Sequence, residues 1–154
     1  MKGQSGVEYL AVYAIAFMIV LVVLAGVYYM WARGRVINPY CEFSVDFVCV
    51  DYSLKENGGL TLMLRQSTGR TINITAFNCT SAENENLIMR PINVQLNDGE
   101  QKVVVANEPC YRASGEIAAG SSGSLYNGKI FIKYVETDTL FEHLIVGRIT
   151  AKYE

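Results

Sequence analysis

The amino-acid sequence predicts an α+β protein in which a long hydrophobic N-terminal α-helix precedes an all-β head of the immunoglobulin-like sandwich type. Two observations carry this prediction: an uncharged apolar run near the N-terminus, and a change from helical to alternating hydrophobic periodicity after about residue 40. The composition agrees with it, because 51% of the 154 residues are hydrophobic and 18% are charged. An average soluble domain has about 25% charged residues.

The apolar run predicts a helix that spans a membrane. No charged residue lies between Tyr9 and Ala32, and residues 11–31 contain no ordinary polar side chain. A helix of this length crosses a hydrocarbon core of about 30 Å, whereas the apolar centre of a secretory signal has about 7–15 residues and a small-residue cleavage site after it. No such site follows the run, so we expect the helix to stay attached to the protein.

The predicted helix ends just before the head begins. Arg33 and Arg35 place cations near its C-terminal end, Gly34 between them weakens the helix, and Pro39 stops it. We therefore expect a hydrophobic helix over residues 4–37 and a head over residues 38–154. Residues 36–154 contain 10 Lys and Arg against 14 Asp and Glu, a net charge of −4. Because this part has no basic stretch, nucleic acid is not expected as a partner.

Alternation of apolar and polar residues predicts seven or eight short strands in the head. Leu60, Leu62 and Leu64 alternate with other residues, and Ile72 and Ile74 do so after a polar turn, so these two segments are expected to form a hairpin. The remaining strands are expected around residues 92–96, 103–105, 130–134, 141–145 and 149–153. No long helix is expected after residue 40.

Four cysteines follow the apolar run and predict two disulfides: Cys41, Cys49, Cys79 and Cys110. Their spacing has neither the close pairs nor the histidine partners that zinc prefers, so no metal site is expected. A straight strand would hold Cys41 and Cys49 about 26 Å apart, so a bond between them requires residues 42–48 to loop back. The preferred pairing is Cys41–Cys49 with Cys79–Cys110, and the alternative is Cys49–Cys79 with Cys41–Cys110.

Two N-x-S/T sequons begin at Asn73 and Asn78 and predict glycosylation, which occurs only on an exported surface. Asn73 alternates with Ile72 and Ile74 and is expected to point outward. Asn78 would lie on the inner face of an unbroken strand, so both asparagines are exposed only if a bulge or a strand end intervenes. Asn73 is therefore the preferred site.

The orientation signals of the chain conflict. Disulfides and sequons favour an extracytoplasmic head, whereas Lys2 before the apolar run and Arg33 and Arg35 after it give a charge bias that favours a cytoplasmic one. Export is the preferred interpretation, because the bias is small and the N-terminus carries a further signal, described below.

No pattern typical of an enzyme is present in the sequence. His143 is the only histidine, and on an alternating strand it is interpreted as a structural residue. The sequence contains no P-loop, GxSxG, HExxH or paired-carboxylate arrangement, and Asp46, Asp51 and Glu56 lack the spacing of a calcium loop. We expect a non-enzymatic protein without catalytic residues, cofactor or metal.

The first ten residues, MKGQSGVEYL, place a lone carboxylate, Glu8, at the edge of the apolar run. Such a charge is costly without a partner, which makes Glu8 a functional candidate; the alternative is a solvated first-turn residue favoured by the helix dipole. With the apolar helix and the β-rich remainder, residues 2–10 resemble the class III signal peptide of archaeal type IV pilins. The resemblance implies that a prepilin peptidase cuts between Gly3 and Gln4, so that residues 1–3 are a leader.

The resemblance also implies a role for Glu8 in assembly. Cleavage would make Glu8 the fifth mature residue, where pilins of this type carry a glutamate, and would free an ammonium group at Gln4 to pair with it within one subunit or between neighbours. Gly6 and Val12 depart from the family pattern, which often has serine and leucine at these positions.

By the same resemblance, the chain is expected to be a structural subunit of an archaeal adhesion pilus, with the helix as filament core and the head as outer coat. The implied partners are other copies of the chain, the prepilin peptidase, and a pilus assembly ATPase with its membrane platform. The precursor would lie in the cytoplasmic membrane and the filament outside the cell. Two alternatives stay open: an archaellin, less favoured because archaellins more often lack the glutamate, and a monomeric membrane-anchored extracellular binding protein.

Overall fold

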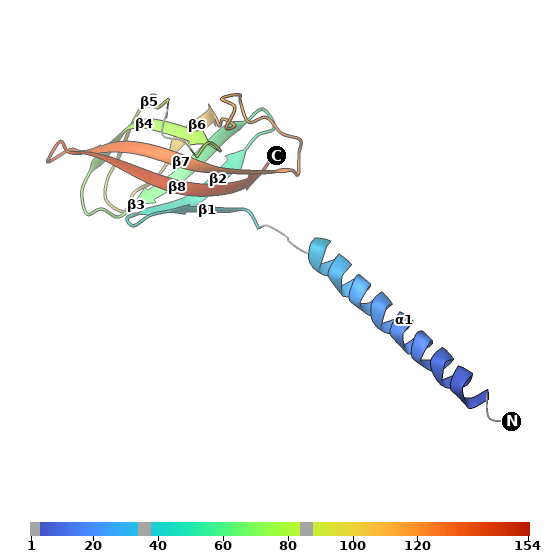
Figure 1. Cartoon of the computed structure of the whole chain (residues 1–154). Coiled ribbons are helices and arrows are strands. Elements are labelled where there is room, and N and C mark those ends of the chain that lie inside the picture. Colours follow the sequence, from blue (N-terminus) through green and yellow to red (C-terminus); the bar gives the residue numbers. More distant parts are fainter. Residues whose placement is uncertain (1–3, 34–37, 84–87) are drawn as a thin grey trace. The chain divides into compact units, whose positions relative to one another are not determined.

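The computed structural model describes residues 4–33, 38–83 and 88–154. The chain divides into two compact units, Met1–Ile37 and Asn38–Glu154, which are drawn in Figure 1. The predicted head begins at the same residue, Asn38. Residues 34–37 of the predicted helix and the predicted leader, residues 1–3, lie outside the described residues.

The first unit contains one helix, α1 (Gln4–Arg33). Its segment Tyr9–Trp31 is long and apolar enough to cross a membrane and has a mean hydropathy of 2.9. A helix suits such a segment, because it satisfies its own backbone hydrogen bonds where neither water nor polar side chains are present.

The second unit is a sandwich of antiparallel strands. The strands are β1 (Tyr40–Phe43), β2 (Phe47–Leu54), β3 (Gly59–Gln66), β4 (Ile72–Thr80), β5 (Arg90–Leu96), β6 (Gln101–Pro109), β7 (Leu125–Glu136) and β8 (Glu142–Lys152). One sheet has the order β1-β8-β7-β4-β5 and the other the order β2-β3-β6. The fold class predicted from the sequence, a hydrophobic helix followed by a β-sandwich head, is therefore confirmed.

The strand order is that of an immunoglobulin-like Greek key. The chain alternates between the sheets, so that β3 pairs with β2 and β6 while β4 pairs with β5 and β7. Strand β5 extends the sheet of β4, and β1 adds a further edge beside β8. In Figure 1 the β7–β8 hairpin projects beyond the neighbouring strands.

The hairpin predicted from residues 60–64 and 72–74 is wrong. These segments are the consecutive strands β3 and β4, but they belong to different sheets, and their apolar side chains meet across the core. The buried Gln66 shapes the crossing: its side-chain nitrogen donates to the Arg70 carbonyl (2.7 Å), and its side-chain oxygen accepts from the Thr68 backbone N–H (2.8 Å). Alternation of the sequence identifies the buried face of a strand but not the neighbouring strand.

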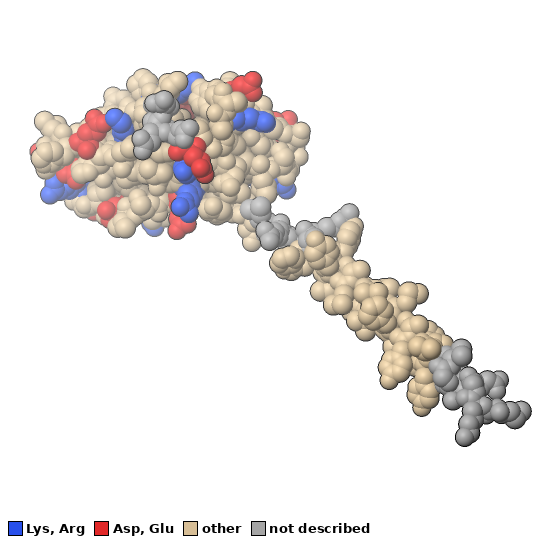
Figure 2. All heavy atoms as spheres, in the orientation of Figure 1, with Lys and Arg blue, Asp and Glu red and all other residues tan. Residues whose placement is uncertain are grey.

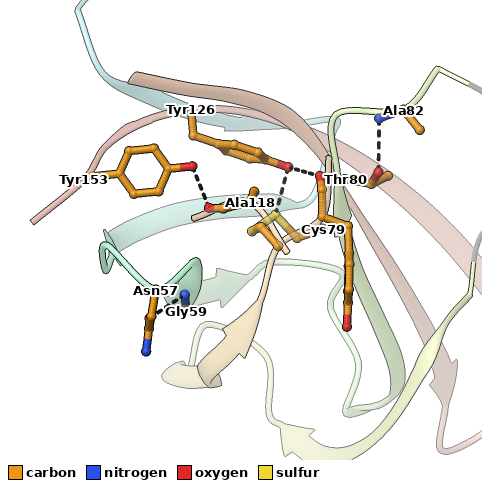
Figure 3. Close-up of a disulfide and its surroundings, with 10 residues drawn as sticks. Asn57, Gly59, Cys79, Thr80, Ala82, Ala118, Tyr126 and Tyr153 are labelled. Carbon is orange, nitrogen blue, oxygen red and sulfur yellow. Dashed lines mark hydrogen bonds between the residues drawn. A yellow bond between two sulfur atoms is a disulfide. The ribbon is translucent and has the colours of Figure 1, made fainter. Parts of the chain in front are cut away.

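Two buried tyrosines close the end of the core near the chain's entry into the head (Figure 3). The Tyr126 hydroxyl donates to the Tyr111 carbonyl (3.1 Å) and lies 3.7 Å from the sulfur of Cys79. The Tyr153 hydroxyl donates to the Ala118 carbonyl (2.6 Å). These bonds hold the long connection between β6 and β7 against the core. Burial, with a smaller contribution from Tyr153, raises the pKa of Tyr126, so this hydroxyl stays a donor at physiological pH.

Candidate functional site

The surface of α1 is the candidate functional site. Its large apolar side chains between Tyr9 and Trp31 are 49–75% exposed. The segment Tyr9–Trp31 contains no charged residue, whereas side chains of both charges are scattered over the visible face of the head in Figure 2. Since an apolar surface of this size is unstable in water, it requires lipid or another apolar protein surface around it.

One side of α1 has a shape suited to packing. A shallow groove there is lined by Leu10, Tyr13, Ala14, Ala16, Phe17 and Val20. Tyr13 and Phe17 stand one helical turn apart, and the alanines between them leave room for close approach by a second helix. The side chains that line the groove are aliphatic or aromatic, so the groove is suited to apolar contact.

Two of the three predicted processing and assembly residues, Gln4 and Glu8, lie in the first two turns of this helix. Gly3 falls outside the described residues. Gln4 is the first residue of α1 and Glu8 follows four residues, about one turn, later. The side chains of both lie outside the described part of the chain, so their predicted roles remain predictions.

Both disulfides form in the pairing preferred from the sequence. Cys41 in β1 bonds Cys49 in β2 with their Cα atoms 5.9 Å apart, and Cys79 in β4 bonds Cys110 after β6 at 4.6 Å. Residues 44–46 supply the reversal that brings Cys49 back to Cys41. Each bond joins the two sheets or the loops next to them, and no described cysteine is free.

The two sequons differ in access. A bulge between Ile74 and Ala76 turns Phe77 and Cys79 inward, and Asn78 between them therefore takes the outer face of the sheet. Even there Asn78 is only 6% exposed, whereas Asn73 is half-buried. A bulge was the condition under which both asparagines could be exposed, and it is present, but it does not expose Asn78. Asn73 is therefore the more accessible of the two asparagines for glycosylation.

His143 belongs to a surface network around Glu136. Its ring stacks on Tyr134 with centroids 5.0 Å apart, and its Nε2 lies 3.6 Å from the Glu136 carboxylate. The same carboxylate accepts hydrogen bonds from the Thr139 hydroxyl (2.8 Å) and the Arg70 guanidinium (2.7 Å). The Thr139 hydrogen bond, followed by Arg70, lowers the pKa of Glu136. These contacts support the structural interpretation of His143.

The described residues contain no cluster of three or more His, Cys, Asp or Glu arranged to hold a metal ion. The sequence interpretation missed a different feature, the exposed apolar tip of the β7–β8 hairpin at Leu140 and Phe141. It placed Phe141 inside a strand, but β8 begins one residue later. Two consecutive large apolar residues directly after the polar stretch 137–139 were the available signal.

Comparison of the chain with models of known protein families gives no match, and comparison with curated proteins gives none either.

Proposed function

We propose that this protein is a structural pilin subunit of an archaeal type IV adhesion pilus that polymerises through α1. The observation that carries the proposal is the uncharged, exposed apolar segment Tyr9–Trp31 of α1, at the start of which the chain resembles a class III signal peptide. Removal of three residues leaves this helix on the protein. When the helix leaves the membrane, its apolar surface has to be buried by other copies, because exposure to water costs about 25 cal/mol per Å².

The head fits the role of an outer coat. It has its own core and two disulfides, and it forms a compact unit without α1. Disulfides persist in oxidising, extracellular surroundings, which supports a surface location for the filament. Adhesion rather than motility is preferred because Glu8 is present, as in the pilins that the N-terminus resembles.

The direct test is the mass of the mature chain together with electron microscopy of the cell surface. We expect a mature chain that begins at Gln4 and filaments that contain it. A chain that retains Met1 and stays in the membrane would instead support the monomeric anchored binding protein. A chain cut after Ala32 would exclude a helical filament core.

A second test addresses Glu8 in assembly. In Glu8→Gln the side chain keeps its shape but loses the charge that would offset a free ammonium group, so we expect normal membrane insertion and cleavage but fewer filaments. Glu42→Gln, which neutralises an exposed carboxylate on β1, is the matched control and should leave filament yield unchanged. Equal filament yields in the two variants would show that Glu8 takes no part in assembly.

A further inference from the structure

The tip of the β7–β8 hairpin presents apolar side chains on a rigid support. Leu140 is 77% exposed and Phe141 is 67% exposed. The Leu140 backbone N–H donates to the Glu136 carbonyl (2.9 Å), and the Thr137 N–H donates to the Thr71 carbonyl (3.1 Å) in the connection between β3 and β4. The tip is therefore held in one shape rather than free to fold back over its own apolar residues.

The backbone of Leu140 is unfavourable for leucine. Its φ of 58° lies in the left-handed region, which is strained for an L-residue other than glycine. Glycine or asparagine would satisfy this turn at lower cost. The leucine gains no burial within the head in return, and such an outlier points to a contact made outside the molecule.

The same end of the head is acidic. Asp46, Asp98 and Asp138 are exposed in three of its turns, and none forms an ion pair within residues 38–83 and 88–154. A surface that fits this end should therefore combine apolar side chains with cations.

The outer face of the five-stranded sheet has that combination. Lys129 on β7 stands opposite Arg148 on β8, and the next outward pair is Phe131 opposite Val146. Val146 is 41% exposed, and Lys152 lies further along the same strand. None of these three cations is in an ion pair with another described residue of the head.

We propose that the hairpin tip of one copy docks on this outer sheet face of a second copy. Leu140 and Phe141 contact Phe131 and Val146, and Asp138 faces the cations beside them. The two surfaces differ, so the contact is heterologous and continues from copy to copy, as an open filament requires. The inference rests on the proposed function, since polymerisation through α1 is what brings the heads together.

The contact cannot form within one molecule. Lys129 and Asp138 are nine residues apart along the β7 hairpin, which corresponds to about 30 Å along a strand. A zero-length cross-link between the Asp138 carboxylate and the Lys129 amine therefore reports two copies in contact. Lys133 and Glu142, whose side-chain nitrogen and oxygen are 2.7 Å apart, provide an internal cross-link in every folded head.

The experiment treats filaments of the full chain with a carbodiimide and identifies the joined peptides by mass spectrometry. We expect a link from Asp138 to Lys129 or Lys152 in filaments, and only the Lys133–Glu142 link in full-length chains dispersed singly in detergent micelles. Leu140→Gly, which suits the backbone and removes the apolar side chain, should lower the intermolecular link about tenfold relative to the internal one. Val103→Thr, on the outer face of the other sheet, is the matched control and should not change the ratio.

The outcomes separate the two proposals. Filaments that form without the intermolecular link overturn the docking inference and leave the pilin proposal intact. If no filaments form, the pilin proposal fails, and the same reaction on membranes densely loaded with the full chain tests docking alone. A missing link there, or an unchanged link in Leu140→Gly, overturns the inference.

Discussion

Single hydroxyl groups fix the connection that carries Cys110 to the core. The rings of Tyr126 and Tyr153 are buried, and each hydroxyl donates a hydrogen bond to a backbone carbonyl in the long connection between β6 and β7. The Tyr111 carbonyl also accepts from the Ser81 backbone N–H (2.9 Å), so removal of the Tyr126 hydroxyl would cost one hydrogen bond and leave the carbonyl with a donor.

Tyr126→Phe should accordingly lower the free energy of unfolding by about 1 kcal/mol. Tyrosine circular dichroism of the full chain in detergent during chemical denaturation measures the change. Tyr40→Phe, which removes a hydroxyl from an exposed ring, should alter stability little. Equal effects in the two variants would contradict the role given to the buried hydrogen bond.

Glu136 gives the head an acid-sensitive contact. Because the pKa of its carboxyl is lowered in the folded head, ionised Glu136 stabilises the head at pH values above the ordinary carboxyl pKa of about 4.3. This stabilisation is lost as the pH falls through the lowered pKa.

Glu136→Gln should therefore be less stable than the unmodified chain near pH 6, and the difference should shrink as the pH falls below about 4.3, as measured by the denaturant midpoint at each pH. Glu116→Gln, in an exposed loop, serves as the control for loss of one negative charge. A stability difference that does not depend on pH would show that the shape of the side chain, and not its charge, matters.

At the scale of elements, the two disulfides close loops of very different length. Cys41 and Cys49 are 8 residues apart, and Cys79 and Cys110 are 31 apart. The entropy lost by the unfolded chain grows with loop length, which gives about 2.5 kcal/mol of stabilisation for the first and about 4 kcal/mol for the second.

Replacing Cys79 and Cys110 together by alanine should thus destabilise the head more than the same change at Cys41 and Cys49. Calorimetry of both double variants under oxidising conditions makes the comparison. The reverse order would mean that the tie between β1 and β2 depends on native contacts more than on loop closure.

The sequence predicted the buried faces of β3 and β4 correctly but predicted their pairing wrongly. Period-two patterns in β3 and β4 marked their buried faces correctly, because burial depends on each strand alone. The pairing could not be predicted, because it depends on where the chain crosses between the sheets. At that crossing the buried Gln66 amide bonds the backbone of Thr68 and Arg70, and no sequence pattern marks this arrangement. The exposure and the positive φ of Leu140 were not predicted for a similar reason, since both are set by the hairpin around it. The processing and assembly roles of Gly3, Gln4 and Glu8 stay predictions.

At the scale of the whole molecule, the two units should be separable. A fragment that begins at Asn38 retains the core and both disulfides. It is expected to be a soluble, folded, β-rich monomer, since it lacks the long apolar surface of α1 and docking of the hairpin tip depends on α1 to bring the heads together. Sedimentation and circular dichroism on the oxidised and reduced fragment test this.

Polymers of the fragment would show that the head drives assembly. An unfolded fragment, even when oxidised, would show that the head depends on its helix or on neighbouring copies.

The Cys41–Cys49 bond also decides how the head responds to mechanical tension. The chain enters the head at Asn38, and β1 is held at the edge of its sheet by four residue pairs with β8. A pull on the entering chain would strip such a short edge strand one pair at a time. The bond instead passes the pull from Cys41 to Cys49 in β2, which pairs with β3 in the other sheet. Only residues 38–41 can then straighten, and tension along the entering chain is shared covalently by both sheets of the sandwich.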